Sequence, residues 1–297
     1  MSASAPVHLV IGANGQVGFE LVQQLAGIGR IIGLARPEVN LENLKTVRDA
    51  IRLHRPSVIW NAAAATAVDM LEESPWLGEQ VNAKAPGVMA EEAKRTGAVL
   101  VQFSTDYVFD GTKTEPYTES DRTNPLNVYG RTKLAGEKAV EDSGARYLIL
   151  RTSWVYSSRG RNFVRAILDR ARESNDLRVV CDQVGAPTWS REIARACARI
   201  APRLDETAGI LHLTAGGSCT WFDFAIALQG EAIRRALPWR AGLEPVTTEE
   251  YGARARRPLN SVLSNEALRA RLGEALPDWG ESHAQFWRTD FTEKEVP

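Results

Sequence analysis

Residues 7–18 read VHLVIGANGQVG, an apolar run followed by three glycines at Gly12, Gly15 and Gly18. Val7–Ala13 is typical of a buried β-strand, and Gln16–Ile28 carries its apolar residues at helical spacing. Glycines between a strand and a helix allow a tight turn, and they let the backbone approach a pyrophosphate at the helix N-terminus. The stretch predicts a dinucleotide-binding unit, although its spacing is not Gly-x-Gly-x-x-Gly. The alternative is a turn that only closes a strand.

The same alternation of strand-like and helix-like segments continues through the first half of the chain. The further strand candidates are Arg30–Leu34, Val58–Ala62, Val99–Ser104 and Tyr147–Thr152, and the helix candidates are Leu41–His54, Pro75–Thr96 and Val128–Ser143. Such alternation requires crossover connections, so strands of one sheet run mostly parallel with helices on both faces. We therefore predict an α/β fold with a Rossmann-type doubly wound sheet.

After about residue 154 the alternation becomes less regular. The helix candidates are Phe163–Arg172, Arg191–Ile200, Trp221–Ala236 and Asn265–Leu272, the short strand candidates are Leu177–Val180 and Gly209–Leu213, and residues 256–261 read as a loop. No long linker separates the two halves. We expect a dinucleotide-binding Rossmann domain over 1–154 and a mainly substrate-binding lobe over 155–297, with segments that return to the main domain.

Composition excludes several classes of protein. The 297 residues are 44% hydrophobic and 25% charged, which is ordinary for a globular chain, and the net charge of −1 offers no attraction to nucleic acid or to an acidic membrane. No stretch approaches the ~18 uncharged apolar residues of a membrane span, and residues 1–6 lack the features of a secretory signal. The three cysteines are far apart and favour reduced thiols. We expect a cytoplasmic protein.

Tyr129 and Lys133 stand four residues apart in NVYGRTKLAGEK, residues 127–138. Residues at i and i+4 share one helical face, so a helix here brings a phenol beside an ammonium group. A nearby positive charge favours phenolate and is expected to lower the tyrosine pKa from its usual value of about 10. Such a tyrosine can exchange a proton with a carbonyl or alcohol oxygen. The alternative is an ordinary pair of neighbours on a helix surface.

Two further segments follow predicted strands, where open α/β sheets bind their ligands. Thr105 and Asp106 follow the fourth strand, so the Thr105 hydroxyl is placed to contact a substrate; alternatively, Asp106 only caps a turn. Arg36 follows the second strand, where an arginine favours the 2′-phosphate of NADPH and an acidic residue would favour NADH. The alternative for Arg36 is a solvated surface side chain. Thr105, Tyr129 and Lys133 together are what a carbonyl reduction by a hydride donor requires.

Seven stretches together resemble the dTDP-4-dehydrorhamnose reductases, which belong to the extended short-chain dehydrogenase/reductase family. They are residues 12–21, 61–64, 104–109, 126–138, 151–156, 182–188 and 257–261. Among them STDYVF, NVYGRTKLAGE, RTSWVY and DQVGAPT are specific in combination. The resemblance extends from about residue 7 to about residue 290.

The resemblance implies a role for each matching residue. Tyr129 would donate the proton, Lys133 would orient the nicotinamide ribose and Thr105 would bind the reacting oxygen. The residues around NADPH or NADH would be Gly12, Asn14, Gly15, Gln16, Val17, Arg36, Asn40, Leu41, Ala63, Ala64, Ala65, Thr66 and Phe103, together with Tyr129 and Lys133. The sugar pocket would be formed by Val68, Thr105, Asp106, Tyr107 and Trp154. Core packing is the alternative for Trp154.

Within that set, Gly15, Gln16 and Val17 would meet the pyrophosphate, and residues 64–66 would pass beneath the cofactor. Asn40 and Leu41 would lie by the adenine. Phe103 would lie near the nicotinamide.

The chain departs from the family pattern at two places. Ala65 stands where the family often has a histidine, which removes a polar side chain beside the cofactor. Some relatives dimerise around Mg²⁺ held by glutamates; Glu20 matches one such position, but Arg191 replaces another and Glu192 would point elsewhere. We predict no metal, and a homodimer is left open.

The function implied is hydride transfer from NADPH or NADH to the C4 ketone of dTDP-4-dehydro-β-L-rhamnose, in dTDP-rhamnose biosynthesis. One alternative is another nucleotide-sugar 4-ketoreductase. A second is a non-catalytic subunit such as the reductase-like regulatory partner of methionine adenosyltransferase, and a third is an epimerase that recycles bound NAD. Neither nucleic acid nor membrane is an expected partner.

Overall fold

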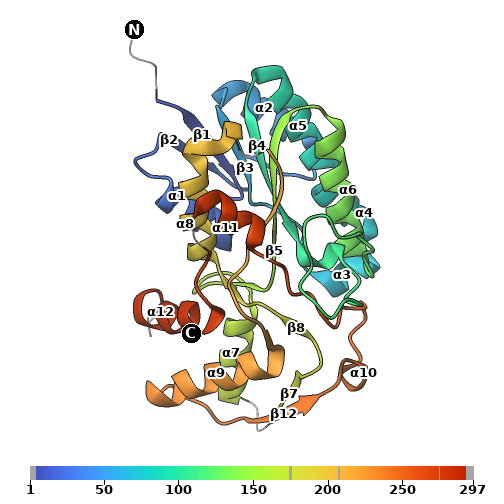
Figure 1. Cartoon of the computed structure of the whole chain (residues 1–297), viewed down its shortest axis with the longest axis vertical. Helices are drawn as coiled ribbons and strands as arrows, with labels where there is room; N and C mark the ends of the chain where they lie inside the picture. The colour runs from blue at the N-terminus through green and yellow to red at the C-terminus, as the bar shows by residue number, and fades with distance from the viewer. Residues whose placement is uncertain (1–4, 174–175, 207, 274, 292–297) are drawn as a thin grey trace.

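A six-stranded parallel sheet forms the centre of the computed structural model, which describes residues 5–291 apart from 174–175, 207 and 274 (Figure 1). The strands lie in the order β10-β5-β4-β3-β1-β2. Their bounds are β1 (Val7–Ile11), β2 (Arg30–Leu34), β3 (Val58–Asn61), β4 (Val99–Thr105), β5 (Arg146–Thr152) and β10 (Gly209–His212). Every neighbouring pair is parallel, so the predicted fold class is confirmed.

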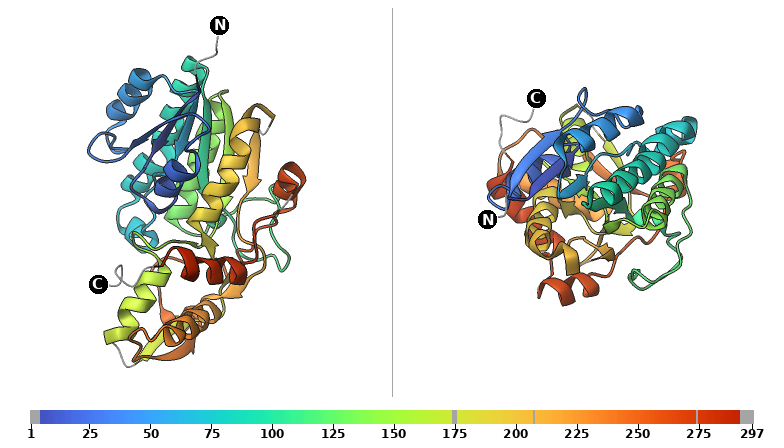
Figure 2. Two further views of the ribbon diagram at one scale, coloured as in Figure 1. Left: turned by 90° about the vertical axis from the view of Figure 1, so that its left-hand side faces the viewer. Right: turned by 90° about the horizontal axis from the view of Figure 1, so that it is seen from above.

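Helices cover both faces of this sheet (Figure 2). One face packs against α1 (Gln16–Gln24) and α8 (Ser190–Ile200), and the other against α2 (Leu44–His54), α5 (Ala85–Thr96) and α6 (Val128–Asp142). β3 and β4 are buried along their whole length, as expected of central strands in a sheet covered on both faces. The carboxyl ends of the strands therefore form the open edge at which a ligand can bind.

The second lobe has its own aromatic-rich core, in which Trp189, Phe224 and Phe286 are fully buried. Its elements are β6 (Val155–Tyr156), α7 (Phe163–Glu173), β7 (Asp176–Val180), β8 (Val184–Gly185), β9 (Thr188–Trp189), β11 (Cys219–Thr220), α9 (Trp221–Arg234), β12 (Gly242–Val246), α10 (Thr248–Tyr251) and α12 (Trp279–Thr289). The strands pair two by two as β12–β7, β11–β8 and β6–β9. α11 (Glu266–Leu272) packs beside β10.

Several predicted element bounds are wrong by a few residues. α2 begins at Leu44 rather than Leu41, because the Asn43 side chain accepts a hydrogen bond from the Lys45 N–H and caps the helix. α1 ends at Gln24 rather than Ile28. β1 ends at Ile11, where Gly12 takes a left-handed φ of +86°.

The predicted helix over 75–96 forms in three consecutive parts. They are α4 (Pro75–Gly78), a π-helical segment η1 (Glu79–Lys84) and α5. α3 (Val68–Glu73), α10, α12 and β12 were not predicted from the sequence.

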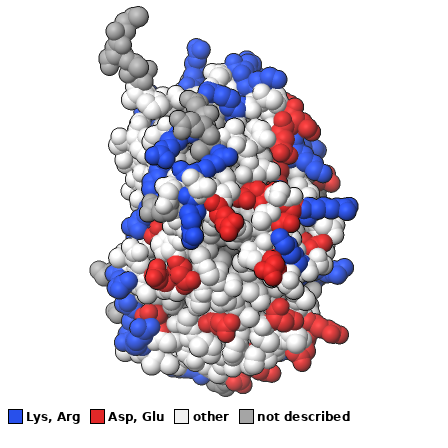
Figure 3. All heavy atoms as spheres, in the orientation of Figure 1, with Lys and Arg blue, Asp and Glu red and all other residues white. Residues whose placement is uncertain are grey.

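The surface carries both signs of charge. On the face drawn in Figure 3, basic and acidic side chains are scattered among each other. No helix in the described part of the chain combines the length and the apolar character that crossing a bilayer requires. Cys181, Cys197 and Cys219 are free thiols.

Candidate active site

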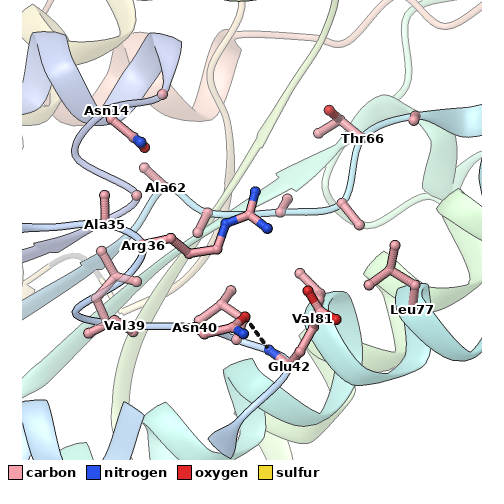
Figure 4. A pocket seen from close by; sticks show the side chains of 18 of the residues that line it. Asn14, Ala35, Arg36, Val39, Asn40, Glu42, Ala62, Thr66, Leu77 and Val81 are labelled. Atoms are coloured by element: carbon pink, nitrogen blue, oxygen red, sulfur yellow. Dashed lines mark hydrogen bonds between the residues drawn. The ribbon is translucent and has the colours of Figure 1, made fainter. Parts of the chain in front are cut away.

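A cavity of about 480 Å³ opens at the carboxyl ends of β1, β2 and β3 (Figure 4). Ten of the residues predicted to bind the cofactor line it: Gly12, Asn14, Gly15, Arg36, Asn40, Leu41, Ala63, Ala64, Ala65 and Thr66. The lining also includes five residues that were not predicted from the sequence, Val39, Glu42, Met70, Leu77 and Val81. These four apolar side chains and one glutamate have helical or loop positions that carry no local signal for ligand binding.

The glycine turn is shaped by close backbone contacts. A Cβ on Gly12 would lie 2.8 Å from the Ala63 nitrogen, and one on Gly18 would lie 2.1 Å from the Gly12 carbonyl oxygen. Only glycine therefore lets α1 approach the turn so closely. Gly15 caps α1 without a side-chain hydrogen bond, so the first N–H groups of the helix point toward the turn unscreened by a capping side chain. This is a cradle that fits a pyrophosphate.

Two predicted pyrophosphate residues lie outside the cavity lining. The Gln16 side chain accepts hydrogen bonds from Ser157 (3.0 Å) and Asn162 (3.1 Å), so it faces the second lobe. Val17 packs against the sheet core. Their side chains therefore connect the turn to the rest of the protein, and their backbone remains at the start of α1.

Arg36 follows β2 and its exposed guanidinium extends into the cavity (Figure 4). Asn40 lies opposite, where its side chain accepts a hydrogen bond from the Glu42 N–H at 3.1 Å. Asn40 and Leu41, the two residues expected at the adenine, lie in the turn before α2. Because α2 begins only at Leu44, both residues can line the cavity.

Residues 62–67 form another wall of the cavity, and Asn82, which was not predicted from the sequence, holds it at Ala65. The Asn82 amide accepts a hydrogen bond from the Ala65 N–H (2.9 Å) and donates to the Ala65 carbonyl (3.0 Å). Asn82 also donates to the Thr132 hydroxyl at 3.3 Å, which joins this wall to α6. A single asparagine inside a helix gives no local signal for such a role. In the structure Asn82 is distinguished by its place in the π-helical segment η1.

Thr105, Tyr129 and Lys133 come together where β4 ends and α6 begins. Asn127 caps α6 by accepting a hydrogen bond from the Gly130 N–H (2.8 Å), and the Glu72 carboxylate accepts another from the Val128 N–H (2.7 Å). The Lys133 ammonium donates to the Phe103 carbonyl oxygen at 2.5 Å. The structure thus assembles the hydroxyl, phenol and ammonium groups that were predicted from separate motifs.

The expected lowering of the Tyr129 pKa by Lys133 is wrong for this structure. Burial raises the pKa of Tyr129 to about 12, against a smaller lowering by a hydrogen bond with Thr105. Burial also lowers the pKa of Lys133 to about 8, while Glu137 acts to raise it. The phenol is therefore protonated near neutral pH, which is the state that a proton donor needs.

Asp106 and Tyr107 follow Thr105 in a short 3₁₀ turn, η2 (Asp106–Val108). The Thr105 hydroxyl donates to Asp106 Oδ1 at 2.9 Å, and burial raises the pKa of Asp106 to about 6. The ring of Tyr107 meets that of Tyr129 edge-on, with centroids 5.8 Å apart. Burial also raises the pKa of Tyr107, so both phenols stay neutral.

A second cavity of about 310 Å³ lies between Tyr107 and the second lobe. Its lining includes cationic, aromatic and polar side chains: Asp69, Tyr107, Phe163, Arg170, Arg178, Gln183, Trp221, Thr248, Tyr251 and Arg257. Arg257 pairs with Asp69 at 2.6 Å, and that hydrogen bond lowers the pKa of Asp69. Val68, which was expected in the sugar pocket, begins α3 next to Asp69.

Trp154 does not line this cavity directly. Its indole stacks on that of Trp221, with ring centroids 3.5 Å apart and planes 7° apart, and Trp221 lines the cavity. Trp154 has a left-handed φ of +45°, which is strained for a bulky residue. No local pattern connects Trp221 with Trp154, because the two are brought together by the pairing of β11 with β8.

Arg191 occupies the position where relatives were expected to place a metal-binding glutamate. It pairs with Glu20 at 3.1 Å and with Asp290, while Glu192 pairs instead with Arg195 at 2.8 Å. In the described part of the chain, no group of three His, Cys, Asp or Glu side chains has the arrangement to hold a metal ion.

Comparison with known proteins identifies a matching family and several relatives that share one name. The family described as RmlD substrate binding domain matches residues 7–290. A dTDP-4-dehydrorhamnose reductase from Burkholderia thailandensis is 46% identical over 283 residues, which cover 91% of this chain and 94% of that protein. The Salmonella typhimurium protein of the same name is 43% identical and covers 91% and 93% of the two chains.

Solved structures agree with these sequence relatives. A dTDP-4-dehydrorhamnose reductase from Bacillus anthracis in complex with NADP superimposes with a TM-score of 0.88 at 33% identity, covering 96% of this chain and 99% of that one. A Thermus thermophilus UDP-glucose 4-epimerase in complex with NAD has a TM-score of 0.77 at 20% identity, covering 95% and 99%, and shares the fold.

Proposed function

Because the chain belongs to the dTDP-4-dehydrorhamnose reductase family, we propose that it reduces the C4 ketone of dTDP-4-dehydro-β-L-rhamnose to dTDP-β-L-rhamnose in dTDP-rhamnose biosynthesis. It is an NAD(P)H-dependent oxidoreductase. The observation that carries the proposal is the Thr105–Tyr129 pair, which lies against Tyr107 of the second cavity, with Lys133 one helical turn along α6. One cavity has the glycine cradle of a dinucleotide site, and the other is rich in cations.

The residues of the first cavity fit NADPH or NADH. The Gly12 and Gly18 cradle and the first N–H groups of α1 would hold the pyrophosphate, and Asn40 and Leu41 would lie by the adenine. Arg36 would pair with a 2′-phosphate, because its planar guanidinium matches two phosphate oxygens. When bound, the cofactor supplies the hydride.

Tyr129 would donate its proton to the alkoxide that develops at the sugar C4 oxygen. Its raised pKa keeps the phenol protonated until that charge appears. The Thr105 hydroxyl would supply a second hydrogen bond to the same oxygen. Lys133 would orient the nicotinamide ribose and stabilise the phenolate once the proton has left.

The second cavity would hold the dTDP-sugar. Arg170, Arg178 and Arg257 supply positive charge for a diphosphate, and Trp221 and Tyr251 supply flat apolar surface for a ring. Asp106, Tyr107 and Val68 would lie toward the sugar. Trp154 would act on the same wall through its stack with Trp221.

The Arg191 guanidinium already pairs with both Glu20 and Asp290, so we propose that the enzyme needs no metal at this position. Dialysis against a chelator should leave the reduction rate unchanged.

The three free thiols support a reducing compartment and hence the cytoplasm. A homodimer would appear in light scattering as twice the 32.7 kDa chain mass.

A panel of 4-keto nucleotide sugars tests the proposal. Purified protein should oxidise NADPH or NADH with dTDP-4-dehydro-β-L-rhamnose and form dTDP-β-L-rhamnose. Faster oxidation with another 4-keto sugar would favour the related ketoreductase. No oxidation with any sugar would favour a non-catalytic subunit, and epimerised product without net cofactor consumption would favour an epimerase.

A further inference from the structure

α6 presents three functional groups at i, i+4 and i+8 on the face that meets the end of β4. They are the Tyr129 phenol, the Lys133 ammonium and the Glu137 carboxylate. Lys133 donates to the Phe103 carbonyl at 2.5 Å, and Glu137 accepts from the Ser104 hydroxyl at 2.5 Å. Consecutive residues of β4 thus fix two successive turns of the helix that carries Tyr129.

Glu137 is also paired with a buried arginine from the next strand. Arg151 on β5 donates from Nε to Oε1 (3.0 Å) and from Nη2 to Oε2 (2.7 Å). The exposed fractions are 1% for Glu137, 2% for Arg151 and 3% for Lys133. Removing charges from water is costly, so a buried carboxylate that pairs with Arg151 and stands one helical turn from buried Lys133 calls for a compensating role.

The other charged groups around Lys133 are engaged elsewhere or exposed. On η2, the Asp106 carboxyl accepts from Thr105, and on α3, Asp69 pairs with Arg257 while Glu72 caps α6. β4 carries no titratable side chain. On η1, Glu79 and Lys84 are exposed, and on α5, Glu92 pairs with Arg52 and Arg95. Among the described residues, Glu137 is the carboxylate that stands one helical turn from Lys133 and acts to raise its pKa.

We propose that Glu137 is a positioning residue for the reduction: its carboxylate, fixed by Ser104 and Arg151, holds Lys133 charged and aimed at the cofactor side of Tyr129. This inference rests on the proposed function, since it takes Lys133 to bind the nicotinamide ribose. It agrees with the direction in which Glu137 shifts the pKa of Lys133. Without the carboxylate, Lys133 would lose the negative charge that opposes the effect of its burial, and it would give up its proton more readily.

Glu137→Gln tests this, because glutamine keeps the side-chain size but removes the charge. We expect the alkaline limb of the kcat/KM profile to move down by about one pH unit, since a neighbouring opposite charge shifts a pKa by about 1–3 units. The rate should therefore fall roughly tenfold at pH 9 and change little near pH 6. NADPH affinity, measured by fluorescence, should show the same shift.

Glu92→Gln is the matched control. Glu92 is also buried, on α5, and it makes the same two-pronged pair with Arg52, away from the site. It should lower thermal stability without moving the pH profile. If Glu137→Gln lowers the melting temperature but its pH profile matches that of wild type, Glu137 is only structural and the proposal is overturned.

Two further readouts separate the failure modes. Glu137→Gln combined with Arg151→Met leaves neither charge unpaired, so this double variant is tested if the single variant does not fold. The alkaline limb of its kcat/KM profile should still lie at lower pH than that of wild type. An unmoved limb would overturn the proposal. The pH dependence of NADPH affinity needs no sugar substrate. If wild type reduces no sugar, the proposed function fails, while a shifted affinity profile would still support the role of Glu137.

Discussion

The Trp154 indole covers Gly185 so closely that a Cβ on Gly185 would lie 2.4 Å from Trp154 Cε2. Gly185 belongs to β8, whose partner strand β11 leads directly into Trp221, the residue on which Trp154 stacks. Three segments distant in the sequence thus determine where one indole lies. Trp154 can occupy this place only because residue 185 is a glycine.

Gly185→Ala should therefore displace Trp154 and disturb the second cavity. We expect kcat/KM for the sugar substrate to fall at least tenfold, while NADPH affinity stays within twofold of wild type, because the first cavity is remote from the change. Gly230→Ala on α9 is the control: no atom lies within 4 Å of the added Cβ. That variant should keep full activity and gain up to ~1 kcal/mol of stability. Unaltered sugar kinetics in Gly185→Ala would contradict the argument.

Tyr129→Phe should remove the proton donor and leave the ring in place against Tyr107. General acid catalysis contributes roughly 10²–10⁴-fold, so kcat should fall by that factor with little change in NADPH affinity. Steady-state rates and fluorescence titration measure the two quantities. Tyr117→Phe is the control, since its hydroxyl donates to Asp110 outside the site and its loss should leave the rate unchanged. A fully active Tyr129→Phe protein would dismiss the role.

Arg36→Ala should selectively weaken NADPH. A hydrogen bond to a charged group contributes roughly 1.5–3 kcal/mol, so the KM for NADPH should rise at least tenfold while that for NADH stays nearly constant. Parallel kinetics with the two cofactors would show this. Arg30→Ala changes an exposed arginine at the opposite end of the same strand and should affect neither value. An equal loss with both cofactors would rule out contact with the 2′-phosphate.

Asp106 should make stability depend on pH. Its folded-state pKa of about 6 lies above the ordinary value of 3.8, so the folded protein binds this proton more tightly than the unfolded chain. Its contribution to stability is therefore full below pH 3.8 and is lost as pH rises through about 6. Relative to wild type, Asp106→Asn should gain roughly 2 kcal/mol between pH 4.5 and 7.5.

Urea denaturation across that pH range measures the difference. Asp110→Asn is the control with the opposite sign: hydrogen bonds, first that from Asn124, lower the pKa of Asp110 to about 2. Its stabilising effect is present above pH 3.8 and is lost only below that, so the difference from wild type should stay flat from pH 4.5 to 7.5. A flat profile for Asp106→Asn would contradict the assigned burial effect.

Arg191→Met should destabilise the junction between the two lobes. The change removes the cation that joins Glu20 of α1 to Asp290 after α12, and Glu20 is left buried without it. We expect a loss of about 1–3 kcal/mol, seen as a lower urea midpoint. Lys45→Met breaks an exposed i,i+4 pair with Asp49 and should cost at most about 0.5 kcal/mol. Equal effects of the two changes would contradict a buried role for Arg191.

The sequence predicted what depends on neighbouring residues. The strand–glycine–helix unit at 7–18 and the Tyr129–Lys133 spacing are local patterns, and both lead to the structures expected from them. β2 was predicted with its bounds. α12 and β12 were missed because their stability comes from the second lobe's core and from pairing with β7, which no local pattern records.

Only the tertiary structure decided the protonation states of the reacting groups and the residues that surround them. The sequence places Lys133 one helical turn from Tyr129, but burial, which depends on the whole fold, raises the tyrosine pKa instead of lowering it. The contacts of Asn82 with Ala65 and of Trp221 with Trp154 join residues far apart in the chain. Periodicity along a chain encodes which face of a helix or strand is buried, whereas the partner on that face is chosen by packing of the complete molecule.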